Sequence, residues 1–79
     1  MAFNYNKLRG KIREKFIRQD EFAKAIGMSK TTLSQKLNNV TQFTQKEIVR
    51  AMNALDLPYT EVDAYFFSQE IQKTVQTQN

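Results

Sequence analysis

Short polar side chains recur at helical spacing between residues 30 and 38 and offer hydrogen-bonding chemistry. A helical period of about 3.6 residues that sets Leu33 and Leu37 inward leaves a polar face on the opposite side. That face consists of Thr31, Gln35 and Asn38, with Ser34 at its edge. Hydroxyl and amide side chains without neighbouring acids suit hydrogen bonds to the edges of DNA bases. The spacing therefore predicts a helix that reads base pairs.

The residues needed for most enzymatic or metal chemistry are missing from the chain. It has no cysteine and no histidine, which removes thiol chemistry, disulfides, the commonest general base and the commonest transition-metal ligand. Its two glycines make no phosphate-binding loop. The acids Asp20 and Glu21 are adjacent and diverge on a helix. We therefore expect a protein that is not an enzyme and that holds no cofactor.

Two short helices joined by a tight turn, over residues 19–39, would position the polar face. Gly27 follows the first helix at a point where a left-handed backbone favours glycine. Ser29 can cap the second helix by accepting a backbone N–H. The first helix buries the apolar side chains of Phe22, Ala23 and Ile26. This arrangement is typical of a helix-turn-helix.

Charge is divided unevenly along the 79 residues, whose net charge is +4. Residues 1–50 hold eleven Lys or Arg against four acids, a net charge of +7, whereas residues 51–79 hold one Lys against four acids, a net charge of −3. A basic end that carries the helix-turn-helix is the polarity expected of a DNA-binding domain. The alternative is an ordinary soluble surface.

Three further helices are expected around this unit. The first runs from a cap at Asn4 or Asn6 to about Phe16. The fourth begins at the capping box of Thr44 and Glu47 and ends before Pro58, and a short fifth runs from about residue 58 or 60 to 67. The expected inward residues are Tyr5, Leu8, Ile12 and Phe16 in the first helix, Ile48, Val49, Met52 and Leu55 in the fourth, and Val62 and Phe66 in the fifth. Gly10 lies almost opposite the first stripe, without an evident packing reason.

The positions of Ala23, Gly27 and Leu33, four and six apart after Gln19, resemble the helix-turn-helix of the phage repressor and Cro family, the XRE group. The stretches FNYNKLRGKIREKF and FTQKEIVRAMNAL resemble small Cro-type regulators of Gram-positive prophages. Roughly residues 4 to 67 are covered. Ile17 and Arg18 stand where the family usually has a small residue and a Ser or Thr cap. Asn39 replaces the usual Gly, although Asn tolerates the left-handed conformation that Gly adopts. The resemblance implies an all-α, five-helix lambda-repressor-like domain.

The same resemblance implies a regulator that binds double-stranded operator DNA. Lys30, Thr31, Ser34 and Gln35 would read bases in the major groove. Arg18, Gln19, Ser29, Lys36, Asn38 and Lys46 would bind phosphates on either side. Because one recognition helix covers few base pairs, a homodimer on a pseudo-palindromic site is expected. The aromatic side chains of Tyr59, Tyr65 and Phe67 are candidates for its interface, or else complete the core.

A second function belongs to another class of protein. The same fold would serve a protein-interaction module that acts mainly by binding a partner repressor, in the manner of an antirepressor. Its interface would be the exposed face of the second motif helix or the aromatic C-terminal part of the domain. A gel shift with the purified protein alone distinguishes this alternative from operator binding.

The expected organisation is one helix-turn-helix domain over residues 1–67 and a polar tail over residues 68–79. Ile71 and Val75 in that tail could share a helix face or lie in a strand. The chain has no apolar run long enough to span a membrane or to act as a signal peptide, so a cytoplasmic protein with no membrane partner is expected.

Overall fold

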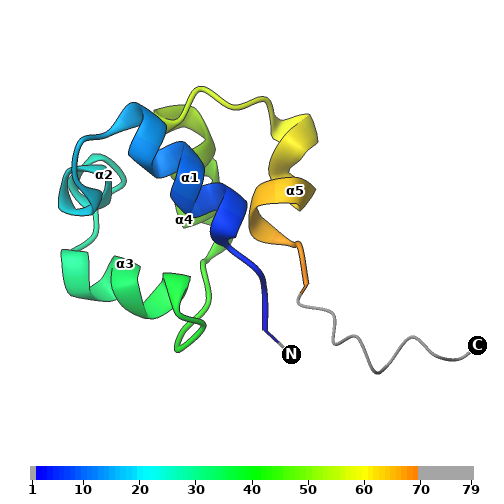
Figure 1. Ribbon diagram of the computed structural model, residues 1–79, viewed down its shortest axis with the longest axis horizontal. Coiled ribbons are helices and arrows are strands. Elements are labelled where there is room, and N and C mark those ends of the chain that lie inside the picture. Colours follow the sequence, from blue (N-terminus) through cyan, green and yellow to red (C-terminus); the bar gives the residue numbers. More distant parts are fainter. Residues whose placement is uncertain (1, 70–79) are drawn as a thin grey trace, which may run out of the picture.

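The computed structural model describes residues 2–69 as a bundle of α-helices around one small core (Figure 1). Its elements are α1 (Asn6–Lys15), α2 (Gln19–Ala25), α3 (Lys30–Leu37), α4 (Gln45–Ala54), the 3₁₀ turn η1 (Tyr59–Glu61) and α5 (Val62–Phe66). Helix α1 contacts α2 on one side and α5 on the other, and α2 packs against α3. The predicted all-α class and its five helices are confirmed.

Every helix contributes its apolar face to the core. From α1 it takes Leu8 and Ile12, which are buried as the predicted stripe requires, and Tyr5 just before the helix is buried with them. Phe16 is only half-buried, and its ring packs against that of Phe22 with centroids 5.3 Å apart. The other buried apolar side chains are Phe22, Ala23, Ile26, Leu33, Leu37, Ala51, Met52, Leu55, Tyr65 and Phe66.

Three successive helices end with one residue in the left-handed backbone region. Gly27, Asn39 and Asp56 follow α2, α3 and α4 with φ of 81°, 64° and 56°. After α2, the Met28 N–H donates to the Ala23 carbonyl at 2.9 Å, and equivalent bonds close α3 and α4. These are Schellman motifs, which satisfy carbonyls that the helix leaves without a partner. The predicted left-handed turn at Gly27 and the tolerance of Asn39 for this conformation are confirmed.

The buried face of α4 differs from the prediction at one position. Ala51, Met52 and Leu55 are fully buried and Ile48 is partly buried, whereas Val49 is 46% exposed. Val49 lies roughly 100° around the helix from Ile48, outside the stripe that the buried residues define. The prediction that Val49 is a core residue is therefore wrong, and Ala51 takes that place.

The aromatic residues near the C-terminus are divided between core and surface. Phe66 and Tyr65 are both buried, and Lys7 lies over the Tyr65 ring at 5.0 Å from its centroid. Tyr59 and Phe67 remain about half exposed. Tyr65 therefore completes the core, which is the alternative that the sequence left open, and does not present surface for a dimer.

The N-terminal segment is held by a side chain from the turn after α3. The Asn39 amide accepts a hydrogen bond from the Phe3 N–H at 3.0 Å and donates one to the Phe3 carbonyl at 2.9 Å. It thus pairs both backbone groups of Phe3, as a neighbouring strand would. Asn39 is therefore constrained twice, by its left-handed backbone and by these two bonds.

The start of the predicted tail pairs with the N-terminus. Gln69 forms an isolated antiparallel bridge with Phe3. The remainder of the tail, with Ile71 and Val75, lies outside the described residues. No helix within residues 2–69 is both long enough and apolar enough to cross a bilayer.

Gly10→Ala is expected to raise the free energy of unfolding by about 0.8–1 kcal/mol. Gly10 lies inside α1, and an added Cβ would have no heavy atom within 4 Å, so alanine gains helix propensity without a clash. Urea denaturation followed by circular dichroism measures the difference. If the variant is less stable than the wild type, an added Cβ at position 10 must clash with atoms that the structure places farther than 4 Å away.

Candidate functional site

The polar face of α3 is exposed as its spacing predicts. Ser29 precedes the helix as its N-cap, and its hydroxyl accepts the Thr32 N–H at 3.1 Å. Leu33 and Leu37 point into the core and fix the rotation of the helix. On the outer side, Lys30, Thr31 and Gln35 are exposed and Ser34 is partly exposed. The four residues predicted to read bases therefore share one accessible face.

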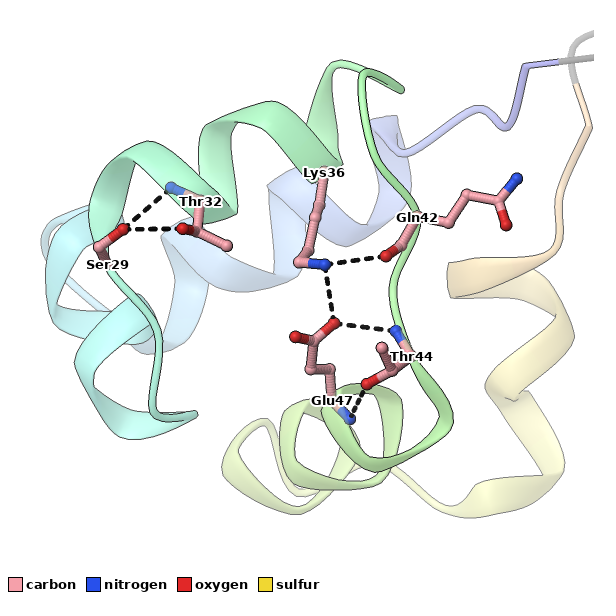
Figure 2. Close-up of polar contacts among 6 residues, drawn as sticks. All are labelled: Ser29, Thr32, Lys36, Gln42, Thr44 and Glu47. Atoms are coloured by element: carbon pink, nitrogen blue, oxygen red, sulfur yellow. Dashed lines mark hydrogen bonds and ion pairs between the residues drawn. The ribbon is translucent and has the colours of Figure 1, made fainter.

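Lys36 does not lie on the outer side of α3. It is 7% exposed, and its ammonium donates to the Gln42 carbonyl at 2.8 Å and pairs with the Glu47 carboxylate at 3.0 Å (Figure 2). Both bonds point toward the interior, between α3 and the start of α4. The prediction that Lys36 binds a phosphate is therefore wrong, because its charge joins two elements of the domain.

Glu47 combines this ion pair with the capping box of α4. Its carboxylate accepts the Thr44 N–H at 2.8 Å, and the Thr44 hydroxyl accepts the Glu47 N–H at 3.2 Å, which confirms the predicted box (Figure 2). Burial alone would raise the pKa of Glu47, but the bonds from Thr44 and Lys36 together outweigh it, so that this pKa lies below its ordinary value of 4.5. The charged form is favoured in the fold.

The lowered pKa of Glu47 predicts a loss of stability in acid. The contribution is fully present above the unfolded-state value of 4.5 and disappears as the pH falls through the lower folded-state pKa. Glu47→Gln should therefore be less stable than the wild type at about pH 7, and that gap should narrow at about pH 3. Urea denaturation of both proteins at the two pH values measures it. A gap of the same size in acid would contradict the role of the carboxylate charge.

The phosphate candidates at the helix starts differ in their surroundings. The Arg18 guanidinium pairs with Asp20 at 3.3 Å, and this hydrogen bond lowers the pKa of Asp20. Gln19 is partly buried in the first turn of α2. Lys46 is exposed in the first turn of α4, and it forms no ion pair within residues 2–69. Of these three, only Lys46 offers an exposed charge that is not paired.

The Asn38 side chain, another phosphate candidate, is hydrogen-bonded within the domain. The Arg9 guanidinium donates to the Asn38 side-chain oxygen at 2.9 Å and to the Leu37 carbonyl at 3.0 Å. Arg9 thus comes from α1 to cover the C-terminal end of α3, where a cation stabilises the unpaired carbonyls. The sequence did not single out Arg9, because five basic residues alternate along α1 and nothing local separates it from the others.

Large apolar side chains lie on the surface, and of these the sequence pointed only to Tyr59 and Phe67 as interface candidates. Ile17, between α1 and α2, is 91% exposed, and Val40, just after α3, is 69% exposed. Val49 and Phe67 lie nearer the C-terminus, at 46% and 48%. The spacing of the α4 stripe alone places Val49 outside it. In the sequence, Ile17 stands out only as a departure from the family pattern. Apolar residues that are exposed singly are ordinary, whereas a contiguous patch is typical of a protein-binding surface.

Comparison with known proteins gives the family. Residues 1–69 match the family described as a protein of unknown function (DUF739). The chain belongs to the DUF739 family. No curated protein matches the sequence.

A structure among those already solved resembles the DUF739 chain over nearly its whole length. It is the solution structure of the modulator of repression (MOR) of the temperate bacteriophage TP901-1 from Lactococcus lactis. The two chains are 38% identical and superpose with a TM-score of 0.75. The match covers 91% of this chain and 97% of that one.

These findings correct the predicted function. The prediction of a Cro-type member of the XRE group that reads operator DNA is wrong, because the matched family is DUF739 and the solved relative is a modulator of repression. These findings also give no support to the predicted homodimer on a pseudo-palindromic site, since that prediction depended on operator binding. The alternative of a module that binds a partner repressor agrees better with the relative.

Proposed function

We propose that this protein modulates repression in a temperate phage by binding a partner repressor protein. The observation that carries the proposal is the 38% identity to a phage modulator of repression over nearly the full length of both chains. Two proteins that share both this identity and the fold are expected to present similar surfaces. The proposed role is binding, with no catalytic step.

Features of the described residues support a protein partner. Exposed apolar side chains such as Val49 and Phe67 gain free energy when a partner removes them from water. The charge of Lys36 is directed into the domain and is unavailable to a ligand. The net charge of +4 would also attract an acidic partner.

A gel shift with three arms tests the proposal. The purified repressor encoded by the same phage genome is mixed with its operator, the chain is mixed with the operator alone, and all three are then combined. We expect the chain to alter the shift of the repressor, by release or by a slower complex, and to give no specific shift by itself. A specific shift by the chain alone, with the repressor band unchanged, would overturn the proposal.

A further inference from the structure

An open groove of about 550 Å³ lies between α4 and α5. Its apolar lining includes the exposed Val49 of α4 and Phe67 at the end of α5. The remaining lining residues are Gln45, Lys46, Ile48, Arg50 and Val62. Because contiguous exposed apolar area often marks an interaction site, this groove is a candidate docking surface.

The rim of the groove carries positive charge only. Lys46 and Arg50 belong to its lining, which contains no acid. Neither side chain forms an ion pair among residues 2–69, although four other basic residues there do: Lys11, Lys15, Arg18 and Lys36. Arg50 reaches from α4 toward the turn after α2, where its Nη1 lies 3.5 Å from the place of a Cβ on Gly27. Lys46 and Arg50 therefore line apolar surface, and neither charge is neutralised by an acid of residues 2–69.

We propose that this groove binds an amphipathic segment of the partner repressor, with apolar side chains on its floor and carboxylates against Lys46 and Arg50. The inference rests on the proposed function and names the surface and the chemistry of the partner. An amphipathic helix laid into an apolar groove is a common mode of recognition, and it presents a row of apolar anchors beside charged residues. The complementary charge sets the orientation and speeds encounter.

Titration calorimetry with the purified full-length repressor tests the inference through two pairs of matched variants. Val49→Asp places a carboxylate on the groove floor and should weaken binding about 100-fold. Val40→Asp changes an exposed valine outside the groove and should bind as the wild type does. Lys46→Glu should weaken binding about tenfold, whereas Lys30→Glu, also in the first turn of an exposed helix, should not. Thermal unfolding checks that all four variants fold.

The outcomes separate this inference from the proposed function. If the wild type does not bind the repressor, the proposed function itself fails. If the wild type binds but Val49→Asp and Lys46→Glu bind equally well, or Val40→Asp and Lys30→Glu lose as much, the groove is not the interface. Sedimentation of the wild type and of Val49→Asp, each alone, tests whether a second copy of the chain occupies the groove. If the wild type is a dimer and Val49→Asp is a monomer, the groove binds a second copy and the inference is overturned.

Discussion

Lys36→Met is expected to lower the free energy of unfolding by about 2–3 kcal/mol. Methionine keeps most of the apolar stem but removes the ammonium, so the Glu47 carboxylate loses its ion pair and the Gln42 carbonyl loses its donor. Breaking a largely buried pair on one side costs more than the pair contributes, because it leaves a charge without compensation. Since the Glu47 side chain is 20% exposed, water recovers part of that cost. Urea denaturation followed by circular dichroism measures the change.

Two controls make the Lys36 result specific. Lys30→Met removes an exposed lysine from the same helix and should change stability by no more than about 0.5 kcal/mol. The double variant Lys36→Met/Glu47→Gln should lose less than the sum of the single variants, because no unpaired charge then remains. A Lys36→Met variant as stable as Lys30→Met would show that the pair between α3 and α4 contributes nothing.

The burial of Lys36 and its pairing with Glu47 could not be predicted from the sequence. Lysine is rarely buried, and its position beside the outward Gln35 indicates the flank of the helix. Its acidic partner Glu47 lies on another helix, and the capping box already gives that carboxylate a local role. Only the approach of α4 to the end of α3 brings the two charges together. A long-range pair of this kind has no signature in the spacing of either helix.

Several signals that act over a few residues agree with the structure, although the cap expected at Asn4 or Asn6 does not: Tyr5 precedes α1 and its side chain makes no capping bond. The left-handed turn at Gly27, the cap at Ser29 and the box at Thr44 each follow from the hydrogen-bonding needs of a nearby helix end. The rotation of α3 was also right, because Leu33 and Leu37 leave only one way to bury both. For α4 the spacing itself favours Ala51, which lies closer than Val49 to the stripe of Ile48, Met52 and Leu55, and the structure buries Ala51.

The residues that define the helix-turn-helix predict its fold but not its function. Ala23, Gly27 and Leu33 determine how α2 crosses α3, and those residues predicted the architecture well. They are buried or lie in the turn, however, so they carry no information about what the outer faces contact. A fold hosts many functions, and function depends on the exposed site. The resemblance to DNA-reading regulators therefore gave the correct helices and the wrong partner.

The largest expected loss of stability comes from the residue that joins α2 and α3. Leu33 is fully buried, and Leu33→Ala should lower the free energy of unfolding by about 2–5 kcal/mol, because it removes apolar contacts and leaves a cavity. The matched control Val40→Ala, at a side chain 69% exposed, should change it by no more than about 0.5 kcal/mol. Thr44→Ala, which removes the cap of α4, should cost about 1 kcal/mol. Thermal and urea denaturation of the three variants give the order directly. If Leu33→Ala melts no earlier than Thr44→Ala, the contact between α2 and α3 is not what holds the helix-turn-helix together.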